Sequence, residues 1–562
     1  MQKVNIQVQL ATSELQTQSL LWGESSAEKG EVFTKPEIVN LILVASGVVR
    51  DLFSIGTRIL EPSCGQGEFV VAIAKHIKVR YESDNLKLPI TQFVNLVRAY
   101  DISSSNLDVA RSNVKAVLSD IYTSTELDTA LNQWFIHEDF LLTDFNEKFT
   151  HVVGNPPYIR IETIPSVLLA EYRHRFVTMI ERADIYIAFY EKCLDLLSNQ
   201  GVLSFICTDR WTKNRYGAGL RSKIASSFQL DLFIDLYGQN AFMSDVMTYP
   251  AITQLSKNKQ KRTCVLHNPN ITPDFSNNLL KCLTDNKLEI LEGAELVVRN
   301  DLVKEDKPWL FGAADELEML SRIEGQFPTL EEAGCSVYIG AATGSNKIYI
   351  VDEDLDIEAN RKIPVITAKE LKSGVIDSKS NYIINTYDDD GVIELEQYPL
   401  LRNYFLEFEV TLKSRHIAKM TPKQWFKTID RVYPERAARE KLLIPDIKSE
   451  LTAIYDDGSY HPNNSIYYIC SATWNLHALR AVLLSGIGQM FVQTYSTKVS
   501  GGNLRFQAQH LRKIRLPFWN EIDSSIQTEL TRIGRTMDTS EAKSLVAQIY
   551  SLNEKEKQIL GM

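Results

Sequence analysis

Short apolar segments alternate with helical patterns between about residue 30 and residue 265. Parallel strands are buried on both faces and are joined by crossover helices, so they read as brief apolar runs between helical stretches. The alternation predicts a mostly parallel, doubly wound, Rossmann-like α/β sheet with helices on both faces. The predicted strands are TRIL (57–60), VRAYD (97–101), WFIHED (134–139), HVVGN (151–155), GVLSFICTD (201–209) and LFIDLYG (232–238).

The pattern also predicts how the rest of the chain is divided. The stretch Ala183–Gly201 reads as a helix that ends on Gly201 as its C-cap. Residues 1–29 read as a polar helical lead-in, and residues 526–562 as a helical tail. From about residue 300 to 525 the alternation is irregular and rich in aromatic and basic residues, which predicts a second, mixed α+β domain.

Composition excludes several classes of protein. With 562 residues, 44% hydrophobic and 23% charged, the chain has the balance of a globular protein with more than one domain. Its apolar runs are too short for a bilayer and its N-terminus has no signal-peptide core, so no membrane association is expected. Seven dispersed cysteines without a CxxC pair, and nine histidines without ligand spacing, predict reduced thiols, no metal site and a cytoplasmic location.

Charge is unevenly distributed along the chain. The net charge of −10 alone argues weakly against nucleic-acid binding. However, Thr411–Lys441 holds nine Lys/Arg against three Asp/Glu, and Lys498–Arg515 holds five Lys/Arg and no acid. Basic surface is therefore concentrated in the C-terminal half, where phosphate contacts are expected.

A glycine motif follows the first predicted strand, in ILEPSCGQGEFVVAIA. Gly65 and Gly67 allow a tight turn at the start of a helix, where main-chain amides meet a ligand. The Lys-Ser/Thr pair of a phosphate-binding loop is missing, and Glu61 would repel phosphate. A carboxylate suits an ammonium group or a ribose, which favours S-adenosylmethionine, whereas a plain packing turn is the alternative.

Acidic residues end the next two predicted strands. Asp101 ends the second strand, where a carboxylate commonly binds ribose hydroxyls. Asp139 and Phe140 end the third, where an acid can accept from an adenine amino group while the ring packs on the base. Solvated turn acids or a helix N-cap are the alternatives. Upstream, Thr34 and Glu37 have the spacing of a capping box, although Thr34 could instead lie against a cofactor.

The sequence Asn155-Pro156-Pro157-Tyr158 follows an apolar strand directly. Proline excludes helix at the preceding residue and cannot donate to a sheet, so the strand ends in a stiff turn. The Asn155 side-chain oxygen and the Pro156 carbonyl are two acceptors that can hold both hydrogens of an exocyclic amino group. Tyr158 can stack on the planar group that carries it. This chemistry is positioning and electrostatics, without a strong base or a covalent intermediate.

These motifs, in this order, resemble those of the gamma-class (TaqI-like) DNA adenine-N6 methyltransferases of bacterial restriction–modification systems. The resemblance implies a catalytic domain at 30–265, a target-recognition domain at 300–525, and a flipped adenine held by Asn155, Pro156, Pro157 and Tyr158. A second aromatic residue, Phe242 or else Tyr249, would cover the other face of the base. The residues that would bind S-adenosylmethionine are Phe33, Thr34, Glu61, Pro62, Ser63, Cys64, Gly65, Gly67, Asp101, Ile102, Asp139, Phe140 and Asn155.

The resemblance also implies double-stranded DNA with a specific recognition sequence as substrate, and a cognate restriction endonuclease as partner. The pieces "VYIGAATGSNKIYIVD", "KLLIPDI" and "VSGGNLRFQAQHLRKIRLP" resemble the specificity domain more loosely. No Glu-x-Lys follows the Pro-Asp of "IPDIKSE" at the distance a fused nuclease needs, so the chain reads as a methyltransferase only. The predicted DNA contacts are Arg436, Arg439, Lys498, Arg505, Arg512 and Lys513.

Several other functions can be weighed against this pattern. Protein-glutamine and RNA amino-group methyltransferases use the same Asn-Pro-Pro-Tyr sequence, although without so large a basic C-terminal half. Cytosine carbon methylation needs a Pro-Cys nucleophile, which the chain lacks, and cytosine amino methylation usually has Ser in place of Asn155. A non-catalytic DNA-binding defence component is the remaining alternative, against which the complete motifs argue.

Overall fold

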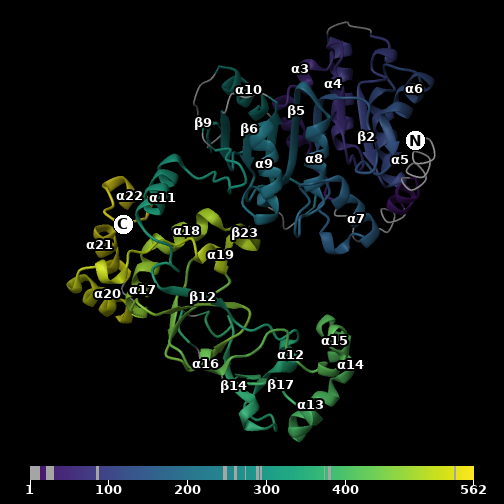
Figure 1. Cartoon of the computed structure of the whole chain (residues 1–562). Helices are drawn as coiled ribbons and strands as arrows, with labels where there is room; N and C mark the ends of the chain where they lie inside the picture. The colour runs from purple at the N-terminus through teal and green to yellow at the C-terminus, as the bar shows by residue number, and fades with distance from the viewer. Residues whose placement is uncertain are drawn as a thin grey trace, which may run out of the picture. The chain divides into compact units, whose positions relative to one another are not determined.

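A computed structural model of the chain describes residues 13–20, 31–83, 88–244, 250–257, 262–272, 274–285, 290–291, 294–300, 302–372, 374–376, 381–536 and 539–562. The chain divides into two compact units, Met1–Phe311 and Gly312–Met562 (Figure 1). The first contains the predicted catalytic domain, and the second contains the predicted tail and the predicted target-recognition domain from residue 312 onward. The domain limits 30–265 and 300–525 remain predictions.

The first unit is built on one nine-stranded sheet with the order β11-β8-β6-β7-β5-β4-β1-β2-β3. Strands β1 to β5 pair in parallel, as do β6 and β8, whereas β7 runs antiparallel between β5 and β6. The edge strand β11 also runs antiparallel to its neighbour β8. The doubly wound fold class is therefore confirmed, with antiparallel strands at β7 and β11 that the sequence pattern did not predict. The strands are β1 Ile59–Glu61, β2 Val97–Asp101, β3 Phe135–His137, β4 Phe149–Gly154, β5 Leu197–Thr208, β6 Gln229–Asp235, β7 Pro250–Ser256, β8 Thr263–His267 and β11 Val297–Arg299, beside a β9–β10 pair at Ile290–Leu291 and Ala294–Glu295.

Helices cover both faces of this sheet (Figure 1). Neighbouring strand residues point to opposite faces, so Ile59 joins one hydrophobic core and Leu60 the other, as do Val153 and Val152. The first core packs under α2, α4, α5, α6 and α10, and the second under α7, α8 and α9. The helices are α2 Pro36–Ala45, α3 Val48–Asp51, α4 Glu68–Ser83, α5 Ser104–Leu118, α6 Ser124–Trp134, α7 Ser166–Arg175, α8 Tyr186–Leu196, α9 Ala218–Ser227 and α10 Phe275–Asp285.

The helix predicted to end at Gly201 ends earlier, at Leu196. Strand β5 begins at the next residue and pairs with β4, and Gly201 lies inside it, at the register shift between the Leu197 and Val202 pairs. A Cβ at Gly201 would lie 2.9 Å from the Phe149 carbonyl oxygen, so the glycine serves close strand approach. The C-cap prediction was wrong because strand pairing, which is a tertiary interaction, outweighs the local glycine signal.

The second unit contains several small sheets surrounded by helices. Its strands are β12 Cys335–Ile339, β13 Ile350–Asp352, β14 Lys362–Ile366, β15 Asn381–Ile384, β16 Tyr387–Asp388, β17 Gly391–Val392, β18 Lys441–Pro445, β19 Ile447–Lys448, β20 Ile454–Asp456, β21 His461–Pro462, β22 Ile466–Ser471, β23 Lys498–Val499 and β24 Asn503–Arg505. Its helices are α11 Ala314–Gln326, α12 Asn346–Tyr349, α13 Pro399–Glu407, α14 Glu409–Ser414, α15 His416–Met420, α16 Pro434–Ala437, α17 Leu476–Val482, α18 Gly488–Tyr495, α19 Ala508–Leu511, α20 Ser524–Thr536, α21 Thr539–Ile549 and α22 Glu554–Ile559. The mixed α+β prediction for this part is confirmed.

Candidate active site

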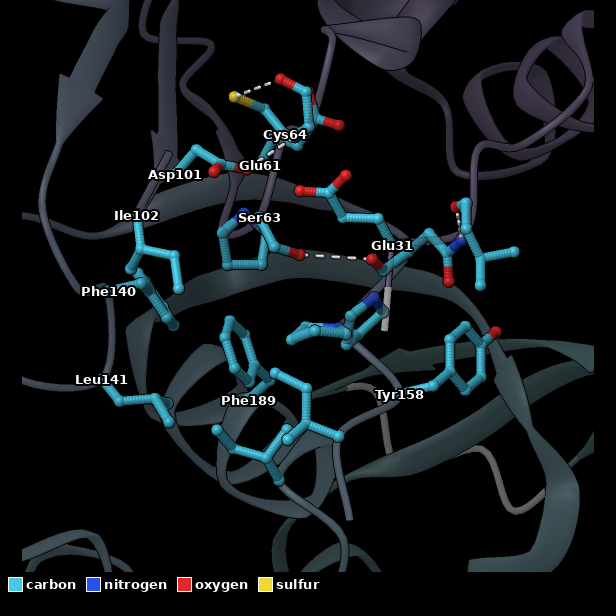
Figure 2. Close-up of a pocket in the computed structure, with 18 of the residues that line it drawn as sticks. Glu31, Glu61, Ser63, Cys64, Asp101, Ile102, Phe140, Leu141, Tyr158 and Phe189 are labelled. Atoms are coloured by element: carbon cyan, nitrogen blue, oxygen red, sulfur yellow. Dashed lines mark hydrogen bonds between the residues drawn. The ribbon is translucent and has the colours of Figure 1, made fainter. Parts of the chain in front are cut away.

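A pocket of about 910 Å³, including its open mouth, lies at the carboxyl ends of β1, β2 and β4. In open α/β sheets this edge is where ligands bind. Figure 2 shows Glu61 and Asp101 on one wall, and Phe140, Leu141 and Phe189 grouped away from Tyr158. Among the predicted site residues, the pocket is lined by Phe33, Thr34, Glu61, Pro62, Ser63, Cys64, Gly65, Asp101, Ile102, Asp139, Phe140, Asn155, Pro156, Pro157 and Tyr158.

The two glycines of the loop have different surroundings. Both have left-handed backbone angles, with φ of +51° at Gly65 and +88° at Gly67. A Cβ on Gly65 would meet the Phe33 ring at 3.3 Å, so the upstream motif packs over the loop. A Cβ on Gly67 would lie 2.8 Å from the Ala110 Cβ. Gly65 therefore lines the pocket, whereas Gly67 allows α4 to approach α5 and supports the cofactor loop from outside the pocket wall.

Asp101 is bound into the glycine loop. Its two carboxylate oxygens accept from the main-chain amides of Gly65 and Ser103, each at 2.8 Å. Burial raises the pKa of Asp101 to about 6, and the amide hydrogen bonds oppose that rise. The carboxylate thus connects the second strand to the first loop, where it was predicted to face a ribose.

Acidic residues dominate the pocket electrostatics. Among the described residues that line the pocket, six are acidic and none is Lys, Arg or His; the six are Glu31, Glu61, Glu68, Asp101, Glu138 and Asp139. Burial, followed by the charges of its neighbours, raises the pKa of Glu61 well above the usual range. Burial likewise raises the pKa of Glu68 to about 6. Such a pocket favours a cationic ligand over an anionic one.

Glu61 shows most directly that this wall can receive a ligand. The residue is 2% exposed, and its Oε2 atom has no hydrogen-bond partner among the described residues. A buried, unpartnered carboxylate oxygen is costly unless a donor reaches it. The ammonium and ribose hydroxyls of S-adenosylmethionine are donors of the required kind, so the residues present fit this cofactor.

The opposite end of the pocket is built around Asp139. One carboxylate oxygen accepts from the Leu141 amide at 2.8 Å, and the other accepts from the hydroxyl groups of Tyr172 and Ser19. Ser19 belongs to the helical segment 13–20, and Gln16 of the same segment also bonds the Asp139 main chain. The predicted adenine acid is therefore oriented from two directions, and the residue lines the pocket.

Asn155 is held in place through its side-chain nitrogen. Its Nδ2 atom donates to the Val32 carbonyl at 2.7 Å and to the Thr34 hydroxyl at 3.2 Å. These two acceptors hold the amide in one orientation. The Oδ1 atom is buried on the pocket wall and has no partner among the described residues. A fixed, unsatisfied acceptor is thus presented beside the glycine loop.

The capping box predicted at Thr34 and Glu37 does not form. Helix α2 begins at Pro36 and its N-cap residue is Lys35, which makes no side-chain cap. Thr34 instead forms an antiparallel bridge with Phe242, and its hydroxyl oxygen accepts from Asn155 Nδ2. The capping prediction was wrong because a partner distant in sequence uses the hydroxyl.

Phe242 reaches Tyr158 but does not line the pocket. The two ring centroids are 6.2 Å apart and the planes make an angle of 76°, so the rings meet edge to face. A base stacked between them needs two parallel faces, so one ring must turn before a base can enter. The hydroxyl of Tyr158 is buried and unpartnered within the described part of the chain. The alternative residue, Tyr249, lies outside the described residues.

Several pocket residues were missed by sequence reasoning. Glu31 and Glu68 flank predicted motifs directly, so proximity to those motifs could have indicated them. Tyr172 and Phe189 lie on α7 and α8, where a buried aromatic residue has the same pattern whether or not it lines a pocket. Ser19 lies in a polar lead-in segment that carried no motif.

The predicted DNA contacts in the second unit have varied surroundings. Arg505 forms a bidentate ion pair with Asp446, and Arg512 pairs with Glu331 at 2.7 Å, so both guanidinium groups already have acidic partners. Arg436 stacks over Tyr433, and Lys513 lies over Tyr495. Arg439 is exposed. The side chain of Lys498 lies outside the described atoms, and all six roles remain predictions.

Comparison with known proteins agrees with this architecture. Residues 41–242 match the family model described as Eco57I restriction-modification methylase, and residues 364–516 match the TaqI-like C-terminal specificity domain. The type II methyltransferase M.XhoI of Xanthomonas vasicola is 41% identical over 95% of this chain and 99% of its own length. The chain belongs to the type II DNA methyltransferases of restriction–modification systems. A second type II methyltransferase, M.PaeR7I of Pseudomonas aeruginosa, is 40% identical over 95% of this chain and 93% of its own.

The fold of this chain is similar to that of a solved structure, and the similarity extends over both units. The structure is that of the type IIL restriction-modification enzyme MmeI in complex with DNA. It aligns with a TM-score of 0.61 at 11% identity, over 94% of this chain and 75% of the other. The predicted class, an adenine-specific DNA methyltransferase with a C-terminal specificity domain, is confirmed at family level.

Among the described residues, no helix is both long and apolar enough to cross a bilayer. Within the same residues, no group of three or more His, Cys, Asp or Glu is arranged to hold a metal ion.

Proposed function

We propose that this methyltransferase transfers a methyl group from S-adenosylmethionine to the exocyclic amino group of an adenine flipped out of duplex DNA. The observation that carries the proposal is Asn155, whose Oδ1 is buried on the pocket wall without a partner while Nδ2 is held by two acceptors. An amino-group donor satisfies that oxygen, and a base inside a duplex cannot supply one there unless it is extruded.

The proposed chemistry relies on positioning. Asn155 Oδ1 and the Pro156 carbonyl accept the two amino hydrogens, which directs the nitrogen lone pair toward the cofactor end of the pocket. When bound, S-adenosylmethionine supplies a methyl group on a positively charged sulfur. Glu61, Asp101 and Glu68 form the acidic wall that binds a cation. Asn155 therefore acts by orientation and electrostatics rather than as a base.

Substrate access requires a change at the aromatic pair. Tyr158 and Phe242 meet edge to face, so the flipped base enters as one ring turns to present its face. Stacking on such a ring contributes about 1–3 kcal/mol per base. The specificity domain of the second unit would select the DNA sequence, and a restriction endonuclease with the same recognition sequence is the partner that a restriction–modification system implies.

The test is a radiolabelled methyl-transfer assay on plasmid DNA, with RNA and a protein extract as parallel substrates. We expect label in DNA alone, and N6-methyladenine as the modified nucleoside by mass spectrometry. Label in N4-methylcytosine would overturn the base assignment, and label in RNA or protein would overturn the substrate class. Long-read sequencing of DNA from cells with and without the gene would then give the recognition sequence.

A further inference from the structure

The turn after β3 forms the Phe140 side of the pocket. Its main chain is wound tightly around Asp139, whose carbonyl accepts from the amides of Leu142 and Thr143, each at 3.1 Å. The Asp139 carboxylate accepts from the Leu141 amide. These bonds use the amides of the turn, so its outward-facing carbonyl groups need donors from elsewhere.

Lys192 of α8 supplies those donors. Its Nζ atom donates to the carbonyl oxygens of Phe140 and Thr143. The same ammonium group lies 4.8 Å from the centroid of the Phe140 ring and 5.0 Å from that of Phe145, within cation–π range. Three residues earlier on the same face of α8, Phe189 stacks on Phe140 with centroids 5.6 Å apart. One helix face therefore holds both the backbone and the ring of Phe140.

Lys192 is unusual because its buried ammonium group lacks an acidic partner among the described residues. Among the described residues, no carboxylate lies within ion-pair distance of Nζ, so its charge is balanced mainly by carbonyl oxygens and aromatic rings. Burial lowers the pKa of Lys192 to about 8; Asp139, Cys193 and Asp144 oppose this fall, whereas the charge of Arg175 adds to it. A buried cation of this kind is costly and persists where its hydrogen bonds hold something in place.

We propose that Lys192 is the positioning residue for the adenine end of the cofactor site, acting through the turn that carries Asp139 and Phe140. The inference rests on the proposed function, because it assumes that this wall receives the cofactor. Lys192 itself does not line the pocket. With its ammonium in place, the Asp139 carboxylate and the Phe140 ring are held at a fixed separation; without it, two carbonyl groups lose their donor and the turn loosens.

The test is binding of S-adenosylmethionine to the purified full-length protein, measured by equilibrium dialysis without DNA between pH 7 and 9.5. We expect Lys192→Met to weaken binding at pH 7 by about tenfold, the usual scale of a hydrogen bond to a charged group. Lys192→Arg keeps a permanent charge and should bind within a few-fold of the wild type at pH 7. Lys148→Met is the matched control, because Lys148 also donates to a carbonyl, that of Asp195, but is exposed.

The pH series separates positioning from general packing. The amino group of the cofactor itself titrates near pH 8, so Lys192→Arg provides the baseline for that effect. The wild type should lose affinity several-fold more than Lys192→Arg between pH 7 and 9.5, because Lys192 becomes neutral and Arg does not. If the wild type and Lys192→Arg lose affinity equally over this pH range, the proposal is wrong. This comparison does not depend on Lys192→Met, so it holds even if that variant fails to fold.

The outcome for the wild type separates this inference from the proposed function. If the wild type binds no S-adenosylmethionine at pH 7, the proposed function fails and the inference fails with it. If the wild type binds the cofactor and methylates DNA, while Lys192→Met is folded by circular dichroism and binds equally well, only the role of Lys192 is wrong.

Discussion

At the scale of single residues, the pocket is defined by polar atoms that lack a partner. Two buried oxygens, Glu61 Oε2 and Asn155 Oδ1, are unsatisfied among the described residues, although most buried polar atoms in proteins are paired. They lie on the wall of the same pocket. One suits a cationic or hydroxyl donor and the other an amino group, which matches a site for two substrates.

Replacing Asn155 should separate chemistry from cofactor binding. Asn155→Ala removes the unpartnered acceptor, so we expect the single-turnover methylation rate to fall about 10²–10³-fold, as for other preorganised polar groups. Affinity for S-adenosylmethionine should stay nearly unchanged, because Glu61 and Asp101 remain. Rapid-quench methylation and equilibrium dialysis measure the two effects, and a mutant with a normal rate would contradict the role of Asn155.

Cofactor binding should also weaken in acid. Burial raises the pKa of both Asp101 and Glu68 to about 6, so below pH 6 each gains a proton and the pocket loses negative charge. Because the cofactor carries net positive charge at neutral pH, affinity should be highest near pH 7 and should fall as the pH is lowered through 6. We expect about a tenfold loss between pH 7.5 and 5. Glu68→Gln should flatten part of this dependence, and an identical profile in that variant would refute the contribution of Glu68.

At the scale of elements, the cofactor loop depends on how closely two helices approach. Gly67 has φ of +88° and lies against Ala110, so a side chain there strains the backbone and separates α4 from α5. Gly67→Ala should lower the free energy of unfolding by about 2 kcal/mol or more. Gly56→Ala, with φ of +87° and nothing within 4 Å, should show only the smaller backbone cost.

A second substitution tests the steric part of that prediction. In Gly67→Ala with Ala110→Gly, the contact is relieved while the backbone strain remains, so part of the lost stability should return. Urea denaturation of the wild type, the two single variants and the double variant measures how much stability returns. If Ala110→Gly destabilises both backgrounds by the same amount, the close approach of α4 and α5 is not the cause.

The sheet should also be sensitive to acid through His151 on β4. Burial lowers the pKa of His151 to about 4, despite Asp51 3.4 Å away. Between the unfolded pKa near 6.5 and the folded value, the unfolded chain binds the proton more tightly, so stability falls as pH falls. We expect this group to lower the free energy of unfolding by about 2 kcal/mol between pH 8 and 5. His151→Gln should lose that part of the pH dependence in urea denaturation.

At the scale of the whole molecule, a basic side chain can contact DNA phosphate only if it is not already paired with an acidic residue. Two of the predicted DNA contacts differ in this respect. Arg505, on β24, is paired with Asp446, which lies between β18 and β19. Arg439 is exposed. We expect Arg439→Ala to weaken DNA binding and to reduce the slope of affinity against salt by about one counterion. Arg505→Ala should instead mainly lower thermal stability, because it leaves Asp446 without its partner.

Fluorescence anisotropy on duplex DNA at several salt concentrations, beside thermal denaturation, measures this pair of outcomes. A reduced salt slope in Arg505→Ala at unchanged stability would show that Arg505, rather than Arg439, contacts phosphate. Arg439→Ala and Arg505→Ala each remove one positive charge, so the two variants have the same net charge.

The sequence by itself determined the doubly wound domain, the order of its motifs and most of the pocket wall. Strand periodicity, glycine turns and Asn-Pro-Pro-Tyr are local, so they can be read from neighbouring residues. Only the tertiary structure decided which partner each polar group takes. The Thr34 hydroxyl oxygen accepts from Asn155 rather than from the amides of a helix end, and Lys192 donates to a turn about fifty residues upstream. Hydrogen bonds and burial depend on distance in space, which the spacing of residues along a chain does not encode.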